Sequence, residues 1–173
     1  MKLSYLFRGP PGHPFHPPLT DVTIGAFTFA TIAAVMSQLG IAEEQFAHGW
    51  WLALIVGLVT SAITAATGWF EYFTITPGTP LRRTALTHAL TMVATLAVFA
   101  LAAIFGHGAY DDSEVTAWPF VLTLAGCGLL FLGGSFGGSM VFVHGMRVLN
   151  LVDAPTREAI SPLSSEEKER AAE

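Results

Sequence analysis

The stretch from Leu81 to Phe105, LRRTALTHALTMVATLAVFALAAIF, decides the fold of this chain. It opens with two arginines and continues as a mainly apolar run, long enough to cross a bilayer core, which takes about 20 helical residues. Three more such runs extend from about Pro18 to Leu39, from Gly49 to Phe73 and from Trp118 to Val148. The sequence therefore predicts four transmembrane helices.

Charge is sorted to one side of this pattern. All eight Lys and Arg residues flank the outer ends of the first and fourth runs or the turn between the second and third: Lys2, Arg8, Arg82, Arg83, Arg147, Arg157, Lys168 and Arg170. The other two connections carry acid: Glu43, Glu44, Asp111, Asp112 and Glu114. Because basic residues near span ends stay in the cytoplasm, both termini are predicted to be cytoplasmic.

Composition agrees with a chain that is solvated mostly by lipid. Of 173 residues, 52% are hydrophobic and only 12% are charged, against about 25% in soluble domains, and the mean hydropathy is +0.55. Short connections predict an all-α, up-down-up-down bundle over residues 18–150, between an N-terminal segment (1–17) and a polar tail (151–173). No internal repeat is evident, and the net charge of −5 gives no reason to expect nucleic acid as a partner.

Two details of the runs carry structural expectations. The fourth run spans about 31 residues, or roughly 46 Å as a helix, so it is expected to tilt or to protrude from the bilayer. Trp50 and Trp51 open the second run and are expected to lie at the membrane interface, where tryptophan is enriched.

Small residues in the fourth run indicate close packing. Two overlapping pairs at four-residue spacing occur, Gly133 with Gly137 and Gly134 with Gly138. Lipid supplies little hydrophobic drive between helices, so close contact requires small side chains. These pairs are predicted to pack within the monomer or between monomers. The alternative is a glycine face left open for a flat cofactor.

Potential ligands gather at the end of the bundle that carries the arginines. They are His13, His16, Glu71, His88 and His144. Ionisable groups that lie inside the membrane interface are energetically costly without partners, which makes them candidates for function. Imidazoles with a carboxylate suit a transition metal, and two imidazoles on facing helices can ligate haem b. The alternatives are a structural hydrogen-bond cluster, in which Glu71 pairs with Arg82, Arg83 or Arg147, and a proton or ion pathway.

The same segments carry a family resemblance. The residues 12–21 (GHPFHPPLTD), 68–72 (GWFEY), 82–89 (RRTALTHA) and 137–148 (GGSMVFVHGMRV) resemble the domain-of-unknown-function 2231 family, predicted bacterial four-helix membrane proteins. The likeness covers residues 12 to 150 and implies the bacterial inner membrane. The family usually has Asp at Glu71 and often has Glu at Ser139. Some relatives are joined to, or lie beside, Rieske-type or cytochrome modules, which implies a redox setting.

Three functions remain open at this point. The first is a redox membrane protein, with His88 and His144 as the leading ligand pair, His16 or His13 as a replacement, and Glu71 orienting an imidazole. It would exchange electrons with a membrane or redox protein partner. The second is a non-catalytic accessory or scaffold subunit of a respiratory-type membrane complex, and the third is a transporter or channel. An electron-transfer or accessory role is favoured over an enzyme, since soluble-enzyme motifs are missing.

Overall fold

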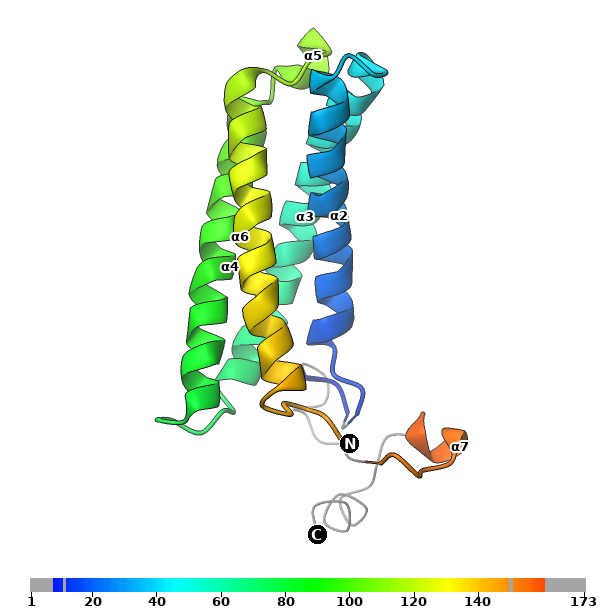
Figure 1. Cartoon of the computed structure of the whole chain (residues 1–173), viewed down its shortest axis with the longest axis vertical. Coiled ribbons are helices and arrows are strands. Elements are labelled where there is room, and N and C mark those ends of the chain that lie inside the picture. The colour runs from blue at the N-terminus through cyan, green and yellow to red at the C-terminus, as the bar shows by residue number, and fades with distance from the viewer. Residues whose placement is uncertain (1–7, 11, 150, 161–173) are drawn as a thin grey trace.

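The structure is a computed structural model that describes residues 8–10, 12–149 and 151–160. Four long helices run up-down-up-down: α2 (His16–Gln38), α3 (Glu43–Tyr72), α4 (Pro80–Phe105) and α6 (Ala117–Phe142) (Figure 1). Two four-residue helices accompany them, α5 (Ala109–Asp112) and α7 (Thr156–Ala159). Each long helix is long and apolar enough to cross a membrane. The predicted four-helix membrane bundle is therefore confirmed.

The two ends of the bundle carry opposite charge. The basic end holds the segment before α2, the α3–α4 turn and the segment after α6, with Arg8, Arg82, Arg83 and Arg147. The acidic end holds the α2–α3 turn and the chain around α5, with Glu43, Glu44, Asp111, Asp112 and Glu114. The part of the polar tail from residue 161 onward lies outside the described residues.

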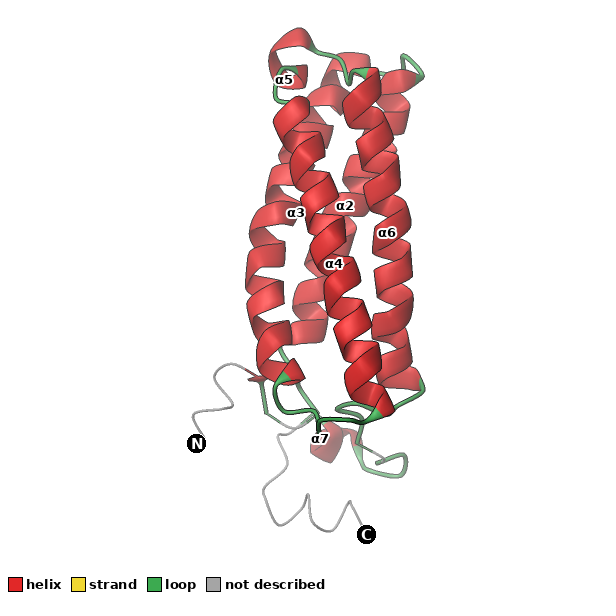
Figure 2. Cartoon of the chain, turned by 90° about the vertical axis from the view of Figure 1, so that its left-hand side faces the viewer, coloured by secondary structure: helices red, strands yellow, loops and turns green. Residues whose placement is uncertain are grey.

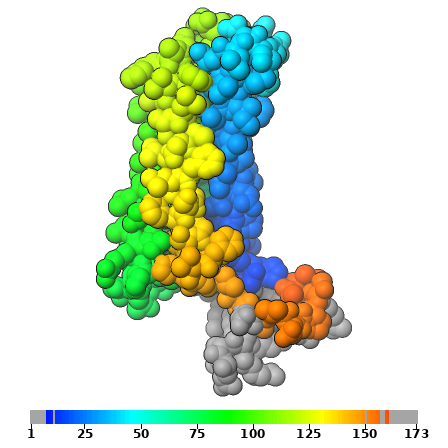
Figure 3. Space-filling model, in the orientation of Figure 1, coloured from blue at the N-terminus to red at the C-terminus, as the bar shows by residue number. Residues whose placement is uncertain are grey.

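The bundle consists of two helical hairpins. α2 packs mainly on α3, and α4 packs mainly on α6, while contacts between the hairpins are less extensive. α3 and α6 lie on opposite sides of α4 (Figure 2), and α2 and α6 run side by side along the surface (Figure 3). The diagonal pairs α2–α4 and α3–α6 therefore face each other across the bundle axis.

The apolar core lies between the middle of the bundle and the acidic end. Its largest fully buried apolar side chains are Trp50, Phe27, Phe99, Leu54 and Val115. Trp50, which the sequence predicts at the membrane interface, is packed inside the bundle: it is 0% exposed, and its Nε1 donates to Thr123 Oγ1 of α6 at 3.0 Å. A buried indole keeps its donor satisfied in this way. Further toward the basic end, the buried side chains are mainly hydroxyl-bearing: Thr23, Ser61, Thr64 and Thr95.

The fourth membrane helix is shorter than the sequence predicts. α6 ends at Phe142 after 26 residues, whereas the apolar run extends to Val148. Gly145 and Arg147 have φ values of 65° and 63°, which lie in the left-handed region and cannot continue an α-helix. The chain turns back here, and Arg147 Nη2 donates to the carbonyl of Arg8 at 2.8 Å. The expected protrusion is thus replaced by a folded segment across the basic end.

Candidate functional site

His16, at the start of α2, is anchored to the neighbouring helix α3. Its Nδ1 lies 3.0 Å from the carbonyl oxygen of Thr64 and 3.2 Å from Thr67 Oγ1. The ring lies against Gly68, where a Cβ atom would come within 2.8 Å of the imidazole Cε1. Glycine at this position therefore leaves the space that the ring fills.

His88 on α4 is held in the same manner by α6. Its Nδ1 lies 2.8 Å from the carbonyl oxygen of Gly133. The ring lies against Gly137, where a Cβ atom would come within 3.1 Å of Cε1. In each hairpin, the first helix thus supplies an imidazole. The second helix supplies the carbonyl that accepts its hydrogen bond and, four residues later, the glycine against which the ring packs.

The match between the hairpins extends beyond the histidines, although no repeat is evident in the sequence. His16 and His88 stand 72 positions apart, as do the stacked Phe27 and Phe99. The glycines that receive these four rings are also paired, 69 positions apart: Gly57 with Gly126, and Gly68 with Gly137. The hairpins are therefore related by a pseudo-two-fold axis along the bundle, an arrangement known for parallel repeats in membrane proteins.

The hydrogen bonds to backbone carbonyls decide the tautomer of both rings. A carbonyl only accepts, so Nδ1 carries the proton in each imidazole, and in the neutral ring the lone pair is on Nε2. No described residue makes a hydrogen bond to either Nε2. A histidine that binds a metal through one nitrogen commonly donates from the other to a carbonyl, which fixes the ring. His16 and His88 have this arrangement, at matched positions of the facing helices α2 and α4.

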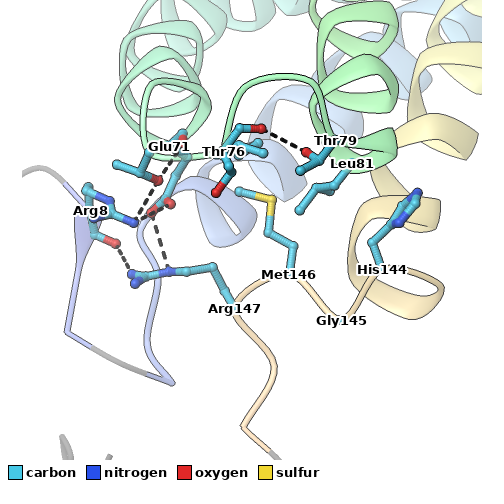
Figure 4. Close-up of a pocket in the computed structure, with 11 residues that line it drawn as sticks. Arg8, Glu71, Thr76, Thr79, Leu81, His144, Gly145, Met146 and Arg147 are labelled. Carbon is cyan, nitrogen blue, oxygen red and sulfur yellow. Dashed lines mark hydrogen bonds and ion pairs between the residues drawn. The ribbon is translucent and has the colours of Figure 1, made fainter.

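Glu71, near the end of α3, is buried in an ion-pair cluster at the basic end. Its residue exposure is 5%. Oε2 lies 3.1 Å from Arg8 Nη2, and Oε1 lies 3.4 Å from Arg147 Nε (Figure 4). The sequence suggested Arg82, Arg83 or Arg147 as the ion-pair partner of Glu71, and the structure contains the pair with Arg147. The predicted role of Glu71 in orienting an imidazole is filled instead by the carbonyls of Thr64 and Gly133.

The remaining predicted ligands lie at the surface. His13 is exposed in the segment before α2. His144 is exposed after α6, where its Nε2 lies 3.3 Å from Thr84 Oγ1. Among the described residues, no three His, Cys, Asp or Glu side chains are grouped so as to hold a metal ion. The structure therefore places His16 with His88, on the facing helices α2 and α4, rather than assembling all five residues.

The glycines of α6 divide between two faces. A Cβ atom at Gly133 would meet Met92 Sδ of α4 at 2.5 Å, and Gly137 receives His88. Gly134 is exposed and has no atom of another residue near its Cβ position, while Gly138 approaches only Phe142 of its own helix. One pair thus lies inside the bundle, and the other faces away from it.

The other two histidines form part of an aromatic cluster at the acidic end. The rings of His48 and Tyr110 have centroids 4.6 Å apart, and His107 meets the ring of Trp51 edge-on at 5.5 Å. The sequence did not predict this cluster, because it depends on α5 folding back over the start of α3.

Fold and site together define a polytopic membrane protein with a four-helix bundle. The model of the family described as "Predicted membrane protein (DUF2231)" matches residues 12–150. The chain therefore belongs to the domain-of-unknown-function 2231 family, as its sequence resemblance predicts. No curated protein and no solved structure gives a significant match.

Proposed function

We propose that this membrane protein binds haem b through the imidazoles of His16 and His88 and transfers electrons. One observation carries this proposal: both rings are fixed by Nδ1–H donation to a carbonyl at matched positions of the two hairpins. Each Nε2 then bears the lone pair that an axial ligand needs. Gly68 and Gly137 leave the space that the two rings fill, so packing as well as hydrogen bonding fixes their orientation.

Ligand number favours haem over a bare metal ion. A structural or catalytic metal ion is usually held by three or four protein ligands, whereas the described residues offer no such group. Haem requires only two axial ligands, because the macrocycle supplies the other four. Bound haem would supply one-electron chemistry. The protein would hold the two imidazoles in fixed orientations inside the helix bundle.

Purification from haem-supplied cells tests this assignment. We expect a Soret band and a haem-b pyridine haemochrome, both lost from His16→Ala and from His88→Ala, with affinity falling at least about tenfold. His144→Ala and His107→Ala are the matched controls and should retain the pigment. A colourless, folded protein contradicts the proposal. Metal found by elemental analysis without a Soret band would assign a bare transition metal instead.

Orientation and partners extend the proposal. Because the arginines lie at one end, we infer that the basic end faces the cytoplasm of a bacterial inner membrane. The haem would then lie nearer the cytoplasmic leaflet and exchange electrons with a membrane or redox protein there.

A second function is favoured by the outward pair Gly134 and Gly138, which no helix among the described residues covers. Small residues facing lipid suit contact with a partner helix, as an accessory subunit of a membrane complex would need. Co-purification of a larger subunit in mild detergent, lost on Gly134→Leu, supports this function. A monodisperse chain without a partner contradicts it.

A further inference from the structure

The basic end contains a pocket that the haem proposal does not use. It has a volume of about 390 Å³ and lies between the end of α3, the α3–α4 turn and the segment after α6 (Figure 4). Its wall includes Arg8, Arg147, Glu71 and the three hydroxyls of Thr74, Thr76 and Thr79. Two guanidinium groups face one carboxylate, which leaves an excess of one positive charge.

The two arginines retain donors that the protein does not use. Arg8 Nε makes no hydrogen bond within the described chain, and the only partner of Arg147 Nε there is Glu71 Oε1, at an ion-pair distance of 3.4 Å without a hydrogen bond. Each guanidinium has five N–H donors in a fixed fork that matches the oxygens of a phosphate group. Glu71 takes only part of this capacity, through its contacts at 3.1 Å and 3.4 Å.

The rest of the wall is rigid and rich in hydroxyls. Thr79 caps α4 by accepting from the backbone N–H of Arg82, and the Arg82 guanidinium donates to the carbonyl of Ile75 at 2.6 Å. These bonds fix the α3–α4 turn that carries Thr76. The nearby N-terminus of α4 contributes a partial positive charge. The hydroxyls of Thr74 and Thr79 already donate to the carbonyls of Glu71 and Thr76, so the guanidinium groups, the Thr76 hydroxyl and the helix N-terminus are the groups left to bind phosphate.

We propose that this pocket binds a phosphate group, which an acidic phospholipid or a soluble phosphate compound would supply. The pocket opens at the end of the membrane helices, where lipid headgroups lie, and basic pockets at such positions bind anionic headgroups. Glu71 competes with the phosphate for the same two guanidinium groups. Charge at position 71 therefore sets the affinity of the site.

Binding is tested in nanodiscs by native mass spectrometry and thermal unfolding, with phosphatidylglycerol, phosphatidylcholine or phosphatidylcholine plus inorganic phosphate. We expect retention of phosphatidylglycerol and a higher unfolding temperature in its presence. Stabilisation by inorganic phosphate alone, to the same extent, would assign the soluble source. Equal behaviour in all three conditions overturns the proposal.

Two variants that are expected to change phosphatidylglycerol retention in opposite directions distinguish a phosphate site from a structural ion pair. Arg147→Gln should weaken phosphatidylglycerol retention about tenfold, the loss expected for one charge-assisted hydrogen bond. Glu71→Gln should strengthen retention, since it removes the competing carboxylate and leaves both partly buried guanidinium groups without a negative partner other than the phosphate. Arg83→Gln, at an exposed arginine of the same end outside the pocket, is the matched control.

Two results overturn the assignment even if Arg147→Gln fails to fold. One is a loss of phosphatidylglycerol retention in Glu71→Gln. The other is an effect of Arg83→Gln as large as that of Arg8→Gln, which would show general attraction to an anionic surface.

Discussion

The phenyl rings of Phe27 and Phe99 stack across the bundle, with centroids 4.1 Å apart and planes 7° from parallel. Each ring also lies over a glycine of its own hairpin, Gly57 beneath Phe27 and Gly126 beneath Phe99. Since the two phenylalanines belong to different hairpins, their contact joins the halves near the bundle axis. The histidines lie three helical turns away, toward the basic end.

Truncation of this pair should therefore destabilise the whole bundle. We expect Phe99→Ala to lower the free energy of unfolding by about 3 kcal/mol, because it leaves a cavity between two hairpins. Phe131→Ala is the matched control, since that ring is 73% exposed and faces lipid. Thermal or denaturant unfolding in detergent measures both. Equal losses would mean that the stacked pair has no special role in joining the halves.

The glycine beneath Phe27 is expected to tolerate no side chain. A Cβ atom at Gly57 would lie 2.5 Å from the Phe27 ring, so Gly57→Ala should cost roughly 1–3 kcal/mol through overpacking. Gly134→Ala should instead be neutral or stabilising by up to about 1 kcal/mol, because its Cβ meets no other atom and alanine favours the helix. Unfolding midpoints of the two variants decide this, and a shift of the same sign in both contradicts the packing.

Sequence patterns predicted the fold well because membrane helices depend on local features. The length of each apolar run and the position of the arginines predict four spans without knowledge of any tertiary contact. The end of α6 was predicted too far along the chain, because Val143 and Val148 are apolar although the backbone turns at Gly145. Hydropathy does not distinguish a helix from a folded segment of similar composition.

Pairing within the site could be predicted only in part. The sequence predicted that His16 and His88 lie at the same end of the bundle, but it favoured His144 as the second ligand beside His88. The depth of each histidine in the membrane was inferred only from its distance to the flanking arginines. The distinguishing signal was the spacing of Phe27 from His16, which recurs between Phe99 and His88. The backbone acceptors at Thr64 and Gly133 could not be predicted, since every residue has a carbonyl and only packing brings one close to an imidazole.

The hydrogen bond between Trp50 and Thr123 joins the other diagonal pair of helices, α3 and α6, at 3.0 Å. A double-mutant cycle of Trp50→Phe and Thr123→Val should give a coupling energy of about 0.6 kcal/mol, the usual size for such bonds between membrane helices. Unfolding free energies of the four proteins measure the coupling. Strictly additive losses would mean that the two side chains do not interact.

Cysteine accessibility tests the orientation on which the haem and electron-transfer proposal depends. In a Cys127→Ala background, which removes the single native thiol, Thr76→Cys places a thiol at the basic end and Glu44→Cys places one at the acidic end, both at exposed positions. Because arginines near span ends are retained in the cytoplasm, a membrane-impermeant maleimide should label Glu44→Cys in intact cells. Thr76→Cys should be labelled only after permeabilisation. The reverse pattern would place the histidine pair and the phosphate pocket outside the cytoplasm, whereas labelling of both thiols in intact cells would contradict the membrane-spanning bundle itself.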